Sequence, residues 1–293
     1  MSLELCILGS GSSGNCAVVR TPAGVMLIDA GVGPRTVAKR LTGTGVGVSA
    51  VRAICLTHLD RDHFTPTWVS TIALRGIRLF CHSHKVNDLL RATMNLESAT
   101  ANRHRRLFKS MIRPFGTSKP FAPMHGLSVH AIKLAHDADG SHGFILDGFN
   151  SRVGYATDLG HVPAGLIERF ENVDVLALES NYDPQMQRDS SRPWFLKQRI
   201  MGGKGHLSNE QAFEAIQRIL DRCERNSRPL PQHIVLLHRS RECNCPHVVK
   251  RLFTQDARVA QRLTLADQFA RSEWLRPVTV KPAVGEQLSL QWT

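Results

Sequence analysis

Thr57-His58-Leu59-Asp60-Arg61-Asp62-His63 is the stretch of sequence on which the fold assignment depends. It follows an apolar run at 53–56 that we predict to be a β-strand. Four of its side chains, two imidazoles and two carboxylates, are competent ligands for zinc, manganese or iron. A turn at the end of a strand can aim such side chains at two ions, whereas a polar loop that caps the next helix is the alternative interpretation.

Three further polar motifs also stand where predicted strands end. His136-Asp137 follows the strand at 129–134, Asp158 follows the strand at 153–156, and His238 follows the strand at 234–237. Taken singly, each histidine is compatible with a structural role, and Asp158 with a turn or a helix cap. Taken together, they predict a chemical site at the ends of the strands, where layered α/β proteins build their sites.

Apolar runs alternate with amphipathic segments along the chain, which indicates a layered α/β fold. We predict strands at 3–8, 25–29, 53–56, 129–134, 144–146, 153–156, 173–178 and 234–237, and helices at 34–41, 66–74 and 208–223. The helix at 208–223 is the clearest, because Ser208 and Gln211 form a capping-box pattern. Thr65 is a candidate N-cap of the helix at 66–74.

The order of these motifs, HxDxDH followed by a distant His, Asp and His, resembles the metallo-β-lactamase superfamily, whose usual pattern is HxHxDH. The resemblance spans residues 5–245, and it implies an αββα four-layer sandwich. The Gly9–Asn15 loop resembles the start of the YycJ-type bacterial subgroup, proposed to act as single-domain DNA exonucleases. Its glycines could cradle a phosphate, but we favour a supporting role near the metals, because no acidic residue stands about 20 residues beyond the last glycine, as the dinucleotide-binding GxGxxG fingerprint requires.

The resemblance implies two divalent metal ions, of zinc, manganese or iron. The first would be held by His58, Asp60 and His136, the second by Asp62, His63 and His238, with Asp158 as the bridge. Position 60 departs from the family pattern, because it carries aspartate where histidine is usual. An added carboxylate favours a harder ion than zinc, such as manganese or iron, although it could also weaken the first site.

Two later segments resemble elements of the tRNA 3′-end-processing ribonucleases. Glu179 and His206 look like a proton-transfer pair of those enzymes, and the HxSR form around His238 also matches. The resemblance implies that Asp62 orients the attacking water and that His206, paired with Glu179, protonates the leaving oxygen or stabilises the pentavalent transition state. The structural alternatives are that Glu179 forms a salt bridge with an arginine and that His206 belongs to a loop that caps the next helix.

The chain is strongly basic, with 37 Lys and Arg against 25 Asp and Glu and a net charge of +12. Such a balance favours nucleic acid or another polyanionic partner, although a generally basic surface is the alternative. We predict one domain over 1–293, with a basic insertion or lid around 91–120 and a closing hairpin after Pro277. The basic residues that could grip a phosphate backbone are Arg103, His104, Arg105, Arg106, Lys109, Arg113 and Lys119.

The sequence contains no apolar run of the roughly 18 residues that a membrane span needs, and its start does not resemble a signal peptide. We therefore expect a cytoplasmic protein with no membrane partner. The seven cysteines lack disulfide-framework spacing. Cys6, Cys55 and Cys81 are predicted core residues, and only the close pair Cys243 and Cys245 could touch the site.

These motifs predict a metal-dependent hydrolase, a phosphodiesterase or nuclease acting on DNA or RNA. Two metal ions would lower the pKa of a water between them and so generate the nucleophile. A di-iron redox enzyme of the same fold is the first alternative, because a carboxylate at the position of Asp60 occurs in the flavin-linked di-iron oxygen reductases. A non-catalytic nucleic-acid-binding relative with a decayed metal site is the second. A thioesterase or lactamase is disfavoured by the Glu179 and His206 elements.

Overall fold

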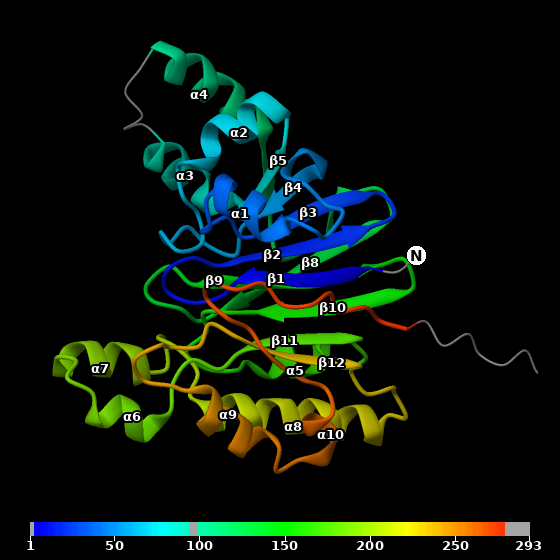
Figure 1. The fold of residues 1–293 in the computed structure, drawn as a ribbon, viewed down its shortest axis with the longest axis vertical. Coiled ribbons are helices and arrows are strands. Elements are labelled where there is room, and N and C mark those ends of the chain that lie inside the picture. The colour runs from blue at the N-terminus through cyan, green and yellow to red at the C-terminus, as the bar shows by residue number, and fades with distance from the viewer. Residues whose placement is uncertain (1–2, 94–98, 279–293) are drawn as a thin grey trace, which may run out of the picture.

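Two β-sheets lie face to face, and helices cover the outer face of each (Figure 1). The computed structural model describes residues 3–93 and 99–278. Helices α1 to α4 lie on one side, and helices α5 and α8 to α10 lie on the other. The predicted αββα four-layer sandwich is therefore confirmed.

The first half of the chain forms a six-stranded sheet in the order β1-β2-β3-β4-β5-β6. Its strands are β1 (Glu4–Gly9), β2 (Cys16–Thr21), β3 (Gly24–Ile28), β4 (Val51–Cys55), β5 (Arg78–His82) and β6 (Ile112–Phe115). Its helices are α1 (Pro34–Leu41), α2 (Trp68–Arg75), α3 (Val86–Ala92) and α4 (Ala99–Met111). Strands β3 to β6 are parallel, so their carboxyl ends meet at one edge of the sheet.

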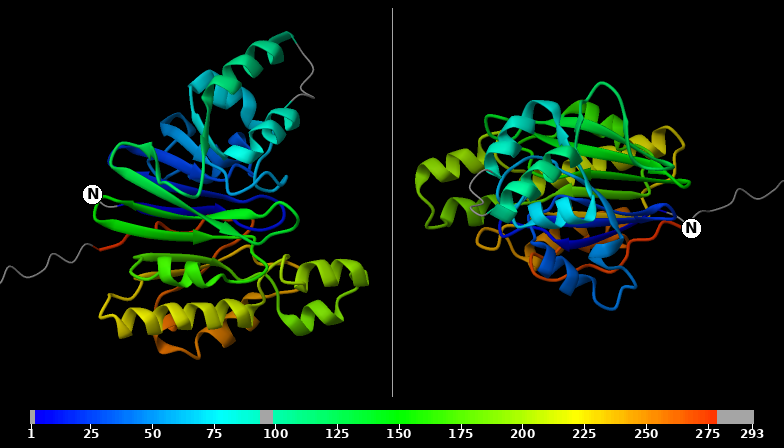
Figure 2. Two further views of the ribbon diagram at one scale, coloured as in Figure 1. Left: turned by 180° about the vertical axis from the view of Figure 1, so that it is seen from behind. Right: turned by 90° about the horizontal axis from the view of Figure 1, so that it is seen from above.

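The second half forms a seven-stranded sheet in the order β13-β12-β11-β10-β9-β8-β7. Its strands are β7 (Phe121–Met124), β8 (Leu127–Leu134), β9 (Ser141–Gly148), β10 (Ser151–Ala156), β11 (Val175–Glu179), β12 (His233–Leu237) and β13 (Leu263–Leu265). Its helices are α5 (Ala164–Arg169), α6 (Pro184–Asp189), α7 (Trp194–Met201), α8 (Asn209–Arg225), α9 (Pro246–Phe253) and α10 (Ala257–Ala260). Helices α6 and α7 project at one end of this half, away from the sheet face (Figure 2).

The strands are apolar on both faces because each sheet packs against the other sheet on one face and against helices on the other face. In β12, Val235 and Leu237 enter the core between the sheets, whereas Ile234 and Leu236 pack beneath the helices. Successive side chains of a strand point to opposite faces, so a strand buried on both sides appears as a continuous apolar run. This is why the short runs in the sequence were readable as strands.

All eight predicted strands are present, with boundaries that differ by at most a few residues. Strands β2, β5, β6, β7 and β13 were not predicted; β6 contains Pro114 and lies in a basic stretch. The capping box is confirmed, since the Ser208 hydroxyl accepts from the Gln211 amide and the Gln211 side chain accepts from the Ser208 amide. The prediction for Thr65 was wrong. Helix α2 begins at Trp68, after a turn in which the Trp68 amide donates to the Thr65 carbonyl, with Thr67 at the N-cap.

The basic stretch at 91–120 contains a helix that the sequence analysis did not predict. Helix α4 packs on α2, with Phe108 fully buried and its ring 6.4 Å from that of Phe64. The chain then enters β6, which pairs in parallel with β5. Part of the segment thus belongs to the outer layer and edge of the first sheet. The hairpin predicted after Pro277 lies almost wholly outside the described residues.

No helix in the described part of the chain is both long enough and apolar enough to cross a membrane. Cys6, Cys55 and Cys81 are buried core residues, as predicted. Cys243 is also buried, beside Tyr182 and Ile200.

Candidate metal centre

All seven predicted metal ligands gather at one edge of the sandwich, where strands from both sheets end. His58, Asp60, Asp62 and His63 follow β4, His136 follows β8, Asp158 follows β10, and His238 follows β12. Ligand atoms of His58, Asp60 and His136 lie within 4.8 Å of one another, and so do those of Asp62, His63 and His238. These are the two triplets expected from the sequence. Cys243 and Cys245 belong to none of the metal-competent groups among the described residues.

The backbone is left-handed at four of the positions where strands turn into the site. The φ angles are 61° at Asp29, 42° at Asp137, 54° at Asp158 and 51° at His238. A residue other than glycine seldom adopts this conformation, which costs on the order of 1 kcal/mol or more, although Asp, Asn and His tolerate it best. The surrounding sheets hold these turns, and the turns aim the carboxylate of Asp158 and the imidazole of His238 inward.

His63 is oriented by a buried carboxylate that the sequence analysis did not single out. Nδ1 of His63 lies 2.8 Å from Oδ2 of Asp29, which ends β3 and is fully buried. The amide and hydroxyl of Thr57 both donate to the same carboxylate. Because Asp29 holds Nδ1, Nε2 of His63 faces the cluster, 3.0 Å from Oδ2 of Asp158. A carboxylate behind a ligand histidine fixes its tautomer and raises its basicity.

The other ligand histidines are held in the same way, through Nδ1. Nδ1 of His136 lies 2.9 Å from the Gly205 carbonyl, and Nδ1 of His58 lies 2.9 Å from the Thr57 hydroxyl. Nε2 of His58 and Nε2 of His238 are buried without a hydrogen-bond partner. A buried polar atom that lacks a partner costs free energy, and a divalent cation would satisfy both of these nitrogens. The residues present therefore fit a metal centre.

The electrostatics of the cluster are those of competent ligands. Burial, aided by the neighbouring His63, lowers the pKa of His58 well below its usual value, so the ring stays neutral. Burial would raise the pKa of Asp62, but the imidazoles of His238 and His63, whose Nε2 atoms lie 3.4 Å and 3.5 Å from its Oδ2, outweigh it and lower that pKa. The same balance lowers the pKa of Asp158, where His238 and His63 offset burial. Burial lowers the pKa values of His63 and His238, but the charge of Asp158 outweighs it and raises both well above their usual value. A cation that bound there would therefore displace their protons, whereas neutral His58 and the ionised carboxylates are already in the forms that bind cations.

Asp60 is the most exposed of the seven, with 54% of its side chain accessible. Its Oδ2 lies 3.8 Å from Nε2 of His58 and 3.9 Å from Nε2 of His136. The shorter side chain at this position therefore still faces both histidines of the first triplet.

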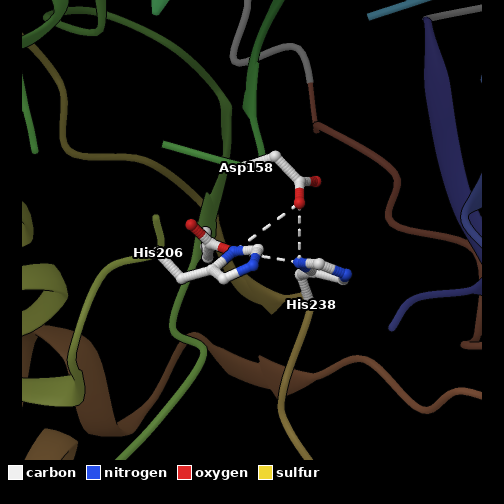
Figure 3. Close-up of side chains that lie close together, drawn as sticks. Asp158, His206 and His238 are labelled. Atoms are coloured by element: carbon white, nitrogen blue, oxygen red, sulfur yellow. Dashed lines mark hydrogen bonds and ion pairs between the residues drawn. The ribbon is translucent and has the colours of Figure 1, made fainter. Parts of the chain in front are cut away.

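Glu179 joins His206 to the cluster, as the resemblance implied. Its Oε1 lies 2.7 Å from Nδ1 of His206 and 3.0 Å from Nδ1 of His238. Figure 3 shows that Asp158, His206 and His238 face one another at this point. The partners of the fully buried Glu179 are thus histidines and backbone amides, and no arginine is among those recorded for the described residues. Ser208, not His206, caps the following helix.

The Gly9–Asn15 loop forms hydrogen bonds with two of the candidate metal ligands, His238 and Asp62. The Ser10 hydroxyl accepts a hydrogen bond of 2.8 Å from the His238 amide. Nδ2 of Asn15 lies 3.1 Å from Oδ2 of Asp62, and the Asn15 amide donates to the Asp62 carbonyl. These contacts agree with the supporting role predicted for this loop.

The cluster opens into a pocket of about 420 Å³. Its floor includes Asp60, Asp62, His136, Asp158, His206 and His238. One wall comes from the α6–α7 segment, through Arg192, Leu196, Arg199 and Ile200. The sequence analysis missed these wall residues, because nothing in a short helix rich in both apolar and basic residues shows which face meets a distant site.

Comparisons with known proteins agree with this geometry. A family model described as a beta-lactamase superfamily domain matches residues 25–234. The chain is 28% identical over 221 residues to "Exodeoxyribonuclease WalJ" of Streptococcus pneumoniae, covering 75% of this chain and 78% of the relative. It is 24% identical over 255 residues to "Exodeoxyribonuclease YycJ" of Bacillus anthracis, covering 87% and 89%. The crystal structure of the metallo-beta-lactamase fold protein YhfI from Bacillus subtilis has a TM-score of 0.63 at 13% identity, covering 93% of this chain and 100% of that one.

Proposed function

The chain belongs to the beta-lactamase superfamily, and we propose that it is a metal-dependent phosphodiesterase that cleaves nucleic acid. The observation that carries the proposal is the convergence of two metal-competent triplets beside the Glu179–His206 pair, with five of the seven ligands and His206 lining one pocket. The thiolate released by thioester hydrolysis departs without a proton, whereas the alkoxide released from a phosphodiester is a poor leaving group that a proton donor assists.

Each triplet would hold one divalent cation, and Asp158 lies between them. His58, Asp60 and His136 form the first group, and Asp62, His63 and His238 form the second. When bound, two such ions lower the pKa of a water between them and stabilise charge on the phosphoryl oxygens. Carboxylates at positions 60, 62 and 158 favour manganese or ferrous iron relative to zinc.

Asp62 would orient the attacking water, because its carboxylate lies at the pocket floor and is itself held by Asn15. His206 would donate a proton to the leaving oxygen. Its ring lines the pocket, and Nδ1 is held by Glu179, so the other nitrogen is available to a substrate. Burial lowers the pKa of His206, but the negative charge of Glu179 outweighs it and raises that pKa, which keeps the proton available.

The substrate we propose is DNA, cleaved from an end. Both relatives that match most of this chain are named exodeoxyribonucleases. The net charge of +12 agrees with a polyanionic substrate.

The test is metal-dependent hydrolysis of bis-p-nitrophenyl phosphate and of an end-labelled DNA oligonucleotide. Chelation should abolish both activities, and manganese should restore them. Asp147→Asn is the matched control for changes in acidic ligands, because Asp147 is 60% exposed and its only recorded ion pair is with Arg152 on the neighbouring strand. Absence of diester cleavage with any divalent metal, together with NADH-linked reduction of oxygen by an iron-loaded protein, would instead support the di-iron alternative.

A further inference from the structure

The wall of the pocket that is made by α6 and α7 carries two large aromatic side chains in solvent. Trp194 and Phe195 are both 73% exposed, more than any other large apolar side chain among the described residues. They begin α7, the helix whose Leu196, Arg199 and Ile200 line the pocket. We call Trp194 and Phe195 the aromatic rim.

Helix geometry places Phe195, one of the two rings, next to the residues that line the pocket. Leu196 and Ile200, four residues apart, share the face that lines the pocket. Phe195 and Arg199 are also four residues apart, so the Phe195 ring neighbours a guanidinium at the pocket wall. Trp194 precedes Leu196 by two residues, so it lies nearly opposite Leu196 on the helix and away from the pocket wall.

Arg199 is placed to contact a phosphate group. Its Nε donates to Oδ1 of Asp137 over 3.0 Å, and its Nη2 donates to Oδ2 of the same carboxylate. Two of the five N–H donors of the guanidinium are used in this way, and 63% of the side chain remains exposed. Asp137 therefore fixes the orientation of Arg199 while leaving donors for a ligand.

Arg192 fixes the segment to the loop that carries His238. Its Nε donates to Glu242 over 3.0 Å, and its Nη1 donates to Gln187 over 3.2 Å. Both Arg192 and Glu242 line the pocket. The rim is consequently attached to the catalytic loops, so a ligand held by the rim is held in register with the floor.

The charge around the rim identifies its partner. Residues 184–204 contain five basic side chains, Arg188, Arg192, Lys197, Arg199 and Lys204, and one acidic side chain, Asp189. A symmetric dimer through this surface would place these like charges against one another, which is unfavourable. A polyanion that also presents flat apolar rings is complementary to it.

We propose that the aromatic rim and Arg199 form a binding subsite for single-stranded nucleic acid. An unpaired base stacks on Phe195 while Arg199 holds a phosphate of the strand that enters the pocket, and Trp194 offers a second ring to the part of the strand that passes round the end of α7. This inference rests on the proposed function and deepens it. Bases in a duplex are stacked on each other and cannot present their faces, so the subsite selects unpaired ends.

The experiment compares three proteins with the wild type. Trp194→Ala/Phe195→Ala removes the rings, Trp194→Phe/Phe195→Tyr keeps them, and Leu74→Ala removes an exposed apolar side chain (68%) from α2 as the control. The substrates are oligo(dT) and oligo(U) of about 12 nucleotides, within the length range of single-strand sites, a blunt DNA duplex, and bis-p-nitrophenyl phosphate.

We expect the double alanine variant to raise KM for single strands by roughly tenfold for each ring removed. Its kcat and its turnover of the small diester should stay within about twofold, because the floor is untouched. The ring-retaining variant and Leu74→Ala should resemble the wild type. An effect on oligo(dT) alone, or on oligo(dT) and oligo(U) together, supports the subsite and shows whether it distinguishes DNA from RNA.

An unchanged KM for both single strands in the double alanine variant would overturn the inference. If sedimentation then shows a wild-type dimer that the variant loses, the rim is a self-association surface. Failure of the proposed function gives a different result, namely no metal-dependent cleavage of the small diester by any of the proteins. In that case quenching of tryptophan fluorescence by oligo(dT), present in the wild type and reduced in Trp194→Phe, still tests the rim directly.

Discussion

The floor and the wall of the pocket are built in opposite ways. The buried ligands beneath the pocket are held by several partners each, as His63 is by Asp29, Asn15 and Asp158, and Asp60 is the exposed exception. The α7 wall instead presents side chains with few partners, and the rings of Trp194 and Phe195 are mostly in solvent. This difference matches two tasks: catalysis requires groups that are already held in position, whereas binding a flexible polymer requires accessible surface. Floor variants should therefore impair all substrates, and wall variants only polymers.

The largest effect is expected from Asp62→Ala. Loss of a ligand that also orients the attacking water should reduce turnover by about a thousandfold or more on both the small diester and the oligonucleotide. Initial rates at saturating manganese provide the measurement. Retention of more than a few per cent of wild-type activity would show that Asp62 is not a catalytic residue.

His206 and Glu179 should give the next largest effect, together with a diagnostic pH profile. His206→Ala should lower kcat by about 10²-fold to 10³-fold, within the range of general-acid contributions. Burial lowers the pKa of His206, but Glu179 raises it above its usual value, so the protonated form is lost only as the pH rises through that raised pKa.

Glu179→Gln removes the charge that raises this pKa, so the alkaline limb of kcat should move to lower pH. The pH dependence of kcat for wild type and variant measures the shift. An unchanged alkaline limb would mean that His206 is not the acid, and that Glu179 acts only by positioning His238.

Asp60→His tests whether the most exposed of the seven candidate ligands sets the metal preference. We expect manganese to support roughly tenfold more turnover than zinc in the wild type, and the variant to shift toward zinc, since imidazole replaces an oxygen ligand. Metal titration of both proteins against one diester measures the preference. The same metal order in both would show that Asp60 does not set selectivity, and a second ion bound only by the variant would indicate partial decay of the first site.

The smallest effect is expected from the basic helix α4, which tests whether the polymer contacts a second surface. Arg106 and Lys109 are exposed there, and Arg106→Ala/Lys109→Ala should weaken oligonucleotide binding a few-fold. The slope of log affinity against log salt should fall by about 1.4 if both contact a single strand. Equal loss on the small diester would mean instead that α4 supports the fold through its packing on α2.

The positions of eight strands and of the seven candidate metal ligands could be predicted from the amino-acid sequence. A strand buried on both faces is a continuous apolar run, and the polar groups at 57–63, 136, 158 and 238 interrupt such runs at their ends. Strands β10, β11 and β12 are parallel, so Asp158 and His238 follow strands that end at the same edge. Residues 57–63 follow β4 in the other sheet, so they meet these groups only because the two sheets lie face to face. The capping box at Ser208 was equally readable, since all of its atoms belong to four consecutive residues.

The side chains that hydrogen-bond to these ligands, and those that line the pocket next to them, could be identified only from the folded structure. Asp29 lies 34 residues from His63 along the chain, and Arg199 lies 62 residues from Asp137, so neither pair leaves a trace in local periodicity. The packing of α4 on α2 likewise depends on long-range contacts, and so does the delayed start of α2, at Trp68 instead of Pro66, because the Thr65 amide donates to the Ala30 carbonyl. Ligand positions follow from where strands end, whereas the orienting partners and the exposed rim follow from which strands and helices become neighbours.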